Sequence, residues 1–255
     1  MTMQPSLETR DLTIRFGGHV AVNAVSCAFH PGELTVIVGP NGAGKTTYFN
    51  LISGQLAATR GQVMKSGTDL TRMSPSARAQ RGIGRAFQLT NLFPQLSVLE
   101  NIRLAVQARS GDGWRILRQV AGLRHLEEQA EHYLEAAKLS GVAHLPASAL
   151  PHGDQRKLEV ALLMAMEPDI YMFDEPTAGM SLDHAPDVLD LIAGIKNDTT
   201  KTVLLVEHKM DVVRSLADRI IVLHNGELLA DGAPDAVMSS DIVRDVYLGK
   251  SAVPA

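Results

Sequence analysis

The 255-residue sequence has few of the residues that mark several common protein classes. It contains one cysteine, Cys27, which excludes disulfide and zinc frameworks, and the apolar neighbours of Cys27 predict a buried, inert thiol. The net charge of −4 gives no electrostatic reason to expect a nucleic-acid partner. The longest apolar run, Val160 to Met166, is far shorter than the roughly 20 residues of a membrane span. The N-terminus lacks the segments of a signal peptide, so the sequence predicts a soluble, cytoplasmic protein that reaches a membrane only through a partner.

The residues that are present suffice for a sizeable core. A hydrophobic content of 45% over this length predicts one α/β domain, or one domain with an inserted subdomain. Apolar runs between turn residues predict strands over Leu7–Phe16, Val20–Phe29, Leu34–Val38, Asp169–Phe173, Thr202–Val206 and Arg219–Leu223. Gly17-Gly18 and Asn225-Gly226 predict hairpin turns, and residues 60 to 86 show turn signals at Gly61, Ser66-Gly67 and Ser74-Pro75. Helical spacing over Thr47–Ser53 predicts a helix that stops at Gly54. Helical periodicity predicts helices over Val98–Val106, His125–Leu139, Leu182–Lys196 and 210–217. The switch in periodicity predicts a helical insertion of roughly 70 residues, at about 89–160, in an otherwise sheet-based chain.

A glycine-rich loop lies between a predicted buried strand and a predicted helix. It fits the phosphate-loop template G-x-x-x-x-G-K-[ST] with the residues Gly39, Pro40, Asn41, Gly42, Ala43, Gly44, Lys45, Thr46 and Thr47. The backbone N–H groups and the positive end of the helix dipole then point at an anion. Lys45 adds a charge for the outer phosphates, and the Thr46 hydroxyl can coordinate magnesium. A chance glycine turn does not account for both flanks, so the loop predicts nucleotide binding.

Four polar residues lie at or just beyond predicted strand ends: Gln88, Asp174, Glu175 and His208. The carboxyl ends of parallel strands are where ligands bind in open α/β sheets. Asp174 can hold magnesium through water and complete the shell begun by Thr46. Magnesium prefers few carboxylates, so Glu175 is free to orient or deprotonate an attacking water. Together with the loop, these residues predict a nucleoside triphosphate hydrolase.

Some of these residues have a structural interpretation as well. Asp174 and Glu175 could simply begin a helix before Pro176, and a lone histidine such as His208 after a strand is more often structural. Phe16 ends a predicted strand, where it can pack against the sheet or stack on a nucleobase, and the residues alone leave both open. The segment from Leu150 to Gln155 opens a helix, because Pro151 and Asp154 both suit an N-terminus.

The motifs, and their order along the sequence, resemble those of the ATP-binding subunits of ABC transporters over essentially the whole chain. The matching segments are Gly39–Thr47 (Walker A), Gln88 (Q-loop), Leu150–Gln155 (signature), Tyr171–Glu175 (Walker B with the catalytic glutamate) and His208 (switch histidine). The resemblance implies a P-loop NTPase fold with an antiparallel β edge subdomain and an inserted α-helical subdomain. It also implies ATP and Mg²⁺ as ligands, with Thr46, Gln88 and Asp174 near the metal. Phe16 matches the aromatic residue that stacks on adenine.

The resemblance further implies a mechanism and partners. In this family two ATPase subunits dimerise head to tail, and each ATP lies between one subunit's phosphate loop and the other's signature helix. A helical subdomain grips a coupling helix of a membrane permease near the Q-loop. The segments Arg81–Gln88, Val206–Met210 and Tyr247–Gly249 are similar to one branch, the LivG-type ATPases of importers for branched-chain amino acids and related amides or urea. That branch implies permeases, an extracytoplasmic solute-binding protein, an unlike second ATPase of the LivF type and a place on the cytoplasmic face of the membrane.

The signature segment departs from the usual Leu-Ser-Gly-Gly-Gln. It reads Leu150, Pro151, His152, Gly153, Asp154 and Gln155. Proline supplies neither the hydroxyl nor the N–H of the usual serine, and Asp154 puts a carboxylate where an anion should bind. Ser181 also replaces the usual aspartate of the loop after Walker B. Pro151 motivates one alternative to a transport ATPase, a regulatory subunit with weak hydrolysis. The other alternative is an ABC-type ATPase that acts outside transport. Such proteins usually have two cassettes or long coiled coils, and this sequence predicts neither.

Overall fold

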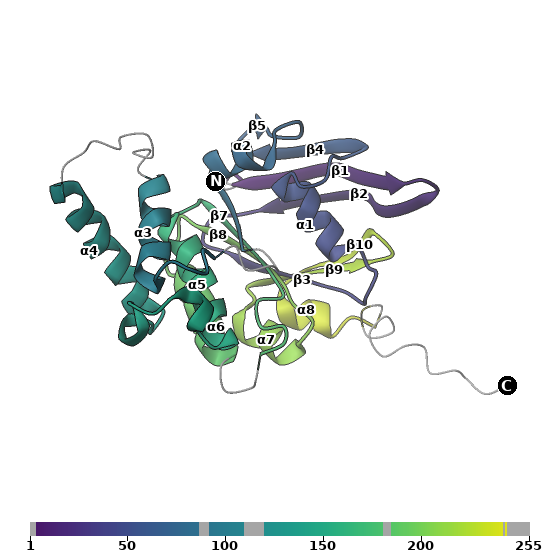
Figure 1. The fold of residues 1–255 in the computed structure, drawn as a ribbon. Helices are drawn as coiled ribbons and strands as arrows, with labels where there is room; N and C mark the ends of the chain where they lie inside the picture. Colours follow the sequence, from purple (N-terminus) through teal and green to yellow (C-terminus); the bar gives the residue numbers. More distant parts are fainter. Residues whose placement is uncertain (1–3, 87–91, 110–119, 181–184, 242, 244–255) are drawn as a thin grey trace. The chain divides into compact units, whose positions relative to one another are not determined.

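The structure is a computed structural model, and it describes residues 4–86, 92–109, 120–180, 185–241 and 243 (Figure 1). The chain divides into two compact units. Unit 1 comprises Met1–Ile83, Asp169–Glu175 and Asp198–Ala255. Unit 2 comprises Gly84–Pro168 and Pro176–Asn197.

Unit 1 contains an antiparallel sheet with the strand order β2-β1-β4-β5. Its strands are β1 (Leu7–Phe16), β2 (His19–Phe29), β4 (Arg60–Lys65) and β5 (Thr68–Asp69). β1 and β2 form the hairpin that Gly17 and Gly18 predicted, with Phe16 opposite His19. β4 and β5 come from a segment for which the sequence predicted only turns.

The second sheet of unit 1 has the order β10-β9-β3-β8-β7. Its strands are β3 (Leu34–Val38), β7 (Ile170–Asp174), β8 (Thr202–Val206), β9 (Arg219–His224) and β10 (Glu227–Gly232). β3, β7, β8 and β9 are parallel neighbours, and every residue of β3, β7 and β8 is buried, which is why these strands are nearly continuous apolar runs. β9 and β10 form the hairpin predicted at Asn225-Gly226. A further strand, β6 (Ile83–Ala86), begins at the last residue of the first segment of unit 1.

Helix α1 (Lys45–Ser53) packs between the two sheets of unit 1 (Figure 1). Its Tyr48, Phe49 and Ile52 side chains are fully buried in a core to which both sheets contribute. Each such buried apolar side chain contributes about 1.5–3 kcal/mol to folding. The helix ends as predicted at Gly54, whose φ of 82° is a left-handed conformation that glycine adopts without strain. The other helices in the described part of the unit are α2 (Pro75–Gln80), α7 (Met210–Leu216) and α8 (Pro234–Met238).

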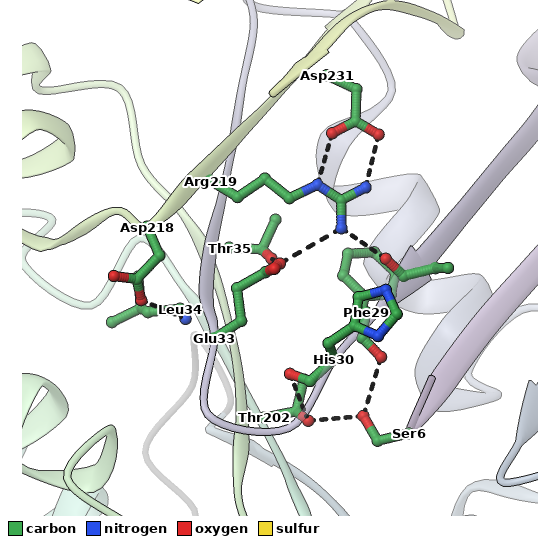
Figure 2. Close-up of polar contacts among 11 residues, drawn as sticks. Ser6, Phe29, His30, Glu33, Leu34, Thr35, Thr202, Asp218, Arg219 and Asp231 are labelled. Carbon is green, nitrogen blue, oxygen red and sulfur yellow. Dashed lines mark hydrogen bonds and ion pairs between the residues drawn. The ribbon is translucent and has the colours of Figure 1, made fainter. Parts of the chain in front are cut away.

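Polar contacts join the two sheets at the amino ends of the parallel strands (Figure 2). Arg219 donates to both oxygens of Asp231 at 2.5 and 2.6 Å and to the carbonyl of Ala28 at 2.6 Å. The hydroxyls of Ser6 and Thr202 lie 2.6 Å apart. Because these contacts lie at the end opposite the phosphate loop, they hold the sheets together without taking part in the predicted site.

Unit 2 is mainly helical. Its elements are α3 (Val98–Arg109), α4 (Val120–Ala136), α5 (His152–Ala165), α6 (Ala185–Ile195) and 3₁₀ turns at Ser140–Val142 and Ala147–Ala149. α5 is the central helix, since α3, α4 and α6 all contact it. None of the described helices is long and apolar enough to cross a membrane.

The ends of two helices in unit 2 have clear local causes. α3 begins with a capping box, in which Ser97 and Glu100 each accept a hydrogen bond from the other's backbone N–H. α4 begins before the predicted His125 and ends before the predicted Leu139. It stops there because Lys138 has a φ of 57° and the Leu139 N–H turns back to the Leu134 carbonyl.

Candidate nucleotide-binding site

The phosphate loop connects the carboxyl end of β3 to the start of α1. Gly39, Gly42 and Gly44 have φ values of 153°, 80° and 96°, which side chains rarely tolerate. A Cβ atom on Gly39 would lie 2.2 Å from the Leu223 carbonyl oxygen, and one on Gly44 would lie 2.5 Å from that of Ala21. A Cβ atom on Gly42 would meet nothing within 4 Å. The loop is therefore packed against the sheets on one side and open on the other.

Lys45 folds back over this loop. Its Nζ atom donates to the carbonyl oxygens of Gly39 at 2.7 Å and Pro40 at 3.1 Å. Burial lowers the pKa of the Lys45 ammonium, and the nearby Glu175 and Asp174 carboxylates oppose this shift. The loop thus presents one positive charge at the start of a helix, where an anion is already favoured by the helix dipole.

A cavity of about 400 Å³ lies over the open side of the loop. It is lined by Phe16, His19, Ala21, Asn41, Gly42, Ala43, Gly44, Lys45, Thr46, Thr47 and Glu175. Phe16 is 50% exposed at the end of β1, so its ring is available to stack on a ligand. His19 and Ala21 were missed from the sequence, although His19 follows Phe16 across a two-residue turn and could have been placed beside it.

Three predicted residues lie at the carboxyl ends of β7 and β8. Asp174 is the last residue of β7 and is 1% exposed. Glu175 has a φ of 47°, and its N–H donates to the Val206 carbonyl at 3.0 Å, which ties the residue after β7 to the end of β8. The Nδ1 atom of His208 lies 3.9 Å from Glu175 Oε1. The fold therefore brings Glu175 and His208 together, with Glu175 also in the wall of the cavity.

The chemistry of these side chains fits a magnesium-bound phosphate. Thr46 offers a hydroxyl oxygen and Asp174 a carboxylate, which are ligands that Mg²⁺ accepts. Among the described residues, no group of three or more His, Cys, Asp and Glu side chains could hold a metal ion. A metal bound here would thus need oxygens from the phosphates themselves, as Mg²⁺ at nucleotide sites commonly does. Gln88, the third predicted metal neighbour, lies outside the described residues.

The segment from Leu150 to Gln155 lies in unit 2, at the start of α5. Pro151 is the N-cap, with an extended ψ of 154°, and the helix begins at His152. The Gln155 side chain donates to the Leu150 carbonyl at 2.9 Å. Asp154 lies in the first turn, as predicted, where the helix dipole stabilises a negative charge. Its carboxylate pairs with Lys157. Ser181, which follows in the next connection, lies outside the described residues.

A second hollow, of about 370 Å³, lies within unit 2, and we call it the unit 2 groove. It is lined by Arg85, Ala86, Phe93, Asn101, Leu104, Ala105, Ala108, Glu159, Leu162, Leu163 and Met166. Phe93 is 56% exposed and Met166 is 43% exposed, so the unit 2 groove presents apolar surface to solvent.

Comparisons with known proteins agree with this geometry. A family model described as ABC transporter matches residues 22–178. The branched-chain amino acid transport ATP-binding proteins BraF of Pseudomonas aeruginosa and LivG of Escherichia coli are 36% and 37% identical to this chain, each over 97% of it and 99% of the relative. A crystal structure of an ABC transporter ATP-binding cassette in its ADP conformation aligns with a TM-score of 0.80 and 28% identity, over 98% of this chain and all of that one. The predicted fold class and family are therefore confirmed: the chain belongs to the ABC transporter family, as an ATP-hydrolysing, ATP-binding subunit.

Proposed function

We propose that this chain powers an importer for branched-chain amino acids or chemically related amides or urea. The observation that carries the ATP-driven part of the proposal is the cavity over the phosphate loop, which has Phe16 and Glu175 in its wall and His208 beside Glu175. The similarity to BraF and LivG supports the solute class. The chain would act as a single ATP-binding domain, with the helices of about 89–160 as its inserted subdomain, at the cytoplasmic face of the membrane.

In this proposal, Phe16 stacks on the adenine ring and the loop from Gly39 to Thr47 binds the phosphates. Glu175 orients a water molecule for attack on the γ-phosphorus and accepts its proton as the bond to ADP breaks. His208 stabilises the charge that develops beside it, and Gln88 senses the γ-phosphate. Thr46 and Asp174, with Gln88, would hold Mg²⁺, which neutralises phosphate charge when bound.

The site becomes complete only in a dimer. A second ATPase, of the unlike LivF type, would cover the ATP with its own signature helix, and this chain would offer Leu150, Pro151, His152, Gly153, Asp154 and Gln155 to the partner's ATP. ATP binding then closes the dimer, and hydrolysis reopens it. Because Pro151 offers neither a hydroxyl nor an N–H, the two composite sites should be unequal.

The unit 2 groove is the surface that we assign to a permease. Its lining is mostly apolar, and the exposed Phe93 and Met166 side chains suit the apolar face of a short helix. A permease helix seated there would transmit dimer closure to the membrane. A solute-binding protein would act through the permease and make no contact with this chain.

Substitution of Glu175 tests the site. In the complex purified through a tag on this chain, Glu175→Gln should retain ATP binding and lower turnover by about 100-fold or more, because the amide cannot accept the proton. Phe16→Ala should instead raise the KM for ATP and leave kcat nearly unchanged. Undiminished hydrolysis by Glu175→Gln would overturn the assignment of the base.

A bulky substitution tests the groove. Ala108 lines the groove on α3, so Ala108→Trp should fill it and prevent co-purification of the permease without a change in thermal stability. Ala136→Trp, on the exposed side of α4, is the matched control and should leave the complex intact. Normal permease recovery with Ala108→Trp would contradict the assignment.

The unusual signature segment around Pro151 motivates one second candidate, a regulatory subunit whose own site hydrolyses ATP weakly while the partner's site tolerates the proline. Under that alternative the partner ATPase supplies nearly all of the turnover, and Glu175→Gln in this chain has little effect. Comparing Glu175→Gln with the equivalent change in the partner separates the two functions. Restoring the hydroxyl with Pro151→Ser should raise turnover at the site built on the partner's phosphate loop.

A further inference from the structure

A chain of four alternating charges runs through the start of α5 and the start of α6 in unit 2. Lys157 Nζ lies 2.7 Å from Asp154 Oδ1 and 3.9 Å from Asp187 Oδ2. The other oxygen of Asp187 accepts a hydrogen bond from Lys138 at 2.7 Å. Asp154 is in the first turn of α5, Asp187 is in the first turn of α6, and Lys138 follows α4. We call these residues the four-charge chain.

Lys157, one of the two inner members of the four-charge chain, is buried. Lys157 is 7% exposed, whereas the Lys138 side chain is 66% exposed. A buried ammonium is costly unless it is paired, and Lys157 is held between two carboxylates that belong to different helices. Acidic residues in the first turn of a helix stabilise it through the dipole, which explains Asp154 and Asp187 singly. It does not explain why a buried lysine joins them.

We propose that Lys157 is a positioning residue for ATP hydrolysis: it neutralises Asp154 and fixes the first turn of α5 to α6. The inference rests on the proposed dimer, in which this turn faces the γ-phosphate of ATP bound to the second ATPase. An unpaired carboxylate there would repel a polyphosphate anion. With Lys157 bound to it, Asp154 adds no net charge. The ion pair also holds the Asp154 carboxylate against α5, the helix to which both residues belong.

The pairing makes a distinctive prediction for double substitutions. In the complex purified through a tag on this chain, Lys157→Met should raise the ATP concentration for half-maximal hydrolysis about ten-fold, with kcat within about two-fold of wild type. The increase should shrink as salt is added, since ions screen the carboxylate of Asp154 once its lysine partner is removed. Asp154→Asn in the same chain as Lys157→Met should restore the wild-type concentration within about two-fold, because no carboxylate is then left to repel the phosphate.

Controls separate positioning from folding. Lys157→Arg keeps the charge and should behave like wild type, and Lys138→Ala removes the exposed end of the four-charge chain and should change the half-maximal ATP concentration less than two-fold. Thermal unfolding of each variant checks the fold. The inference is overturned if Lys157→Met leaves the half-maximal ATP concentration unchanged. It is also overturned if Asp154→Asn does not reverse the increase that Lys157→Met causes. A wild-type complex without ATPase activity would instead overturn the proposed function, so the two failures are distinguishable.

Discussion

The Nδ1 atom of His208 lies 3.9 Å from the Oε1 atom of Glu175, which is beyond hydrogen-bond distance. The arrangement follows from the sheet, because β7 and β8 are parallel neighbours and each residue comes just after its strand. The Glu175 N–H bond to the Val206 carbonyl fixes the spacing of the two strand ends. In the proposed function, the two side chains act together on the γ-phosphate and on the water that attacks it.

In the proposed function, His208 contributes to kcat rather than to the binding of ATP. His208→Ala should lower kcat for ATP hydrolysis by about 10- to 100-fold and leave the KM nearly unchanged, because the residue acts on developing charge rather than on binding. Steady-state hydrolysis over a range of ATP concentrations measures both constants. His144→Ala, which removes an exposed histidine of unit 2, is the control and should have no effect. A raised KM with an unchanged kcat would show that His208 only binds ATP.

The parts of the fold that the sequence predicted depend on short patterns. The buried strands β3, β7 and β8 are continuous apolar runs, and the hairpin turns carry Gly17-Gly18 and Asn225-Gly226. Long-range pairing was not predictable in this way. β1 pairs with β4, which lies more than 40 residues away in the sequence. Neither strand has a residue pattern that predicts which strand it pairs with. Sheet order is set by packing over the whole core, which a local pattern does not contain.

The same distinction holds for the site. The loop from Gly39 to Thr47 and the acidic pair Asp174-Glu175 at the end of β7 were found because their chemistry is local and their spacing is fixed. The pair of Asp154 and Lys157 is also local, at i and i+3 on one helix, and could have been inferred. The contact of Lys157 with Asp187 could not, because it depends on how α5 packs on α6.

The phosphate-loop glycines should differ in their response to alanine. Gly39→Ala places a Cβ atom 2.2 Å from the Leu223 carbonyl oxygen, so we expect the loop to be displaced and ATP affinity to fall more than ten-fold. Gly42→Ala is the matched variant, since it meets no atom within 4 Å and costs only the roughly 1–2 kcal/mol of a left-handed backbone. Calorimetric titration with ATP and thermal unfolding compare them. Equal effects would contradict the role of the Leu223 contact.

Substitution of Arg78 should be among the most destabilising changes in unit 1. Its side chain is 2% exposed and donates to the carbonyls of Leu51 and Ile52 at 2.6 and 2.7 Å, at the end of α1. It also donates to the Thr71 carbonyl at 2.8 Å. Arg78→Met leaves these acceptors without their donor, so the free energy of unfolding should fall by about 3 kcal/mol or more. Its position in a polar helical segment gave no sign of this burial in the sequence.

Urea unfolding measures the effect of Arg78, and a lysine variant refines it. Arg78→Lys keeps the charge at the negative end of the α1 dipole but cannot reach all of these carbonyls, so its loss should be intermediate. Because α1 begins with the phosphate loop, Arg78→Met should also raise the KM for ATP. Stability equal to wild type in Arg78→Met would refute the assigned role.

The buried thiol of Cys27 predicts a pH dependence of stability. Burial raises the pKa of Cys27 from 9.0 to about 11. Between these values the unfolded chain has released the thiol proton and the folded chain still holds it. The stability is therefore fully present below pH 9.0 and is lost as pH rises toward 11, with a slope of up to about 1.4 kcal/mol per pH unit from this group.

Cys27→Ala isolates that slope. Urea unfolding of both proteins in steps from about pH 8 to pH 10 should show that wild type loses stability faster than the variant as pH rises, whatever their difference at neutral pH. The range ends near pH 10 because Tyr48, whose pKa burial also raises, adds the same kind of loss to both proteins above it. The folded wild-type protein should also react slowly with iodoacetamide at pH 8, since so little thiolate is present. Parallel pH profiles together with rapid alkylation of the folded protein would show that Cys27 is not protected as the fold indicates.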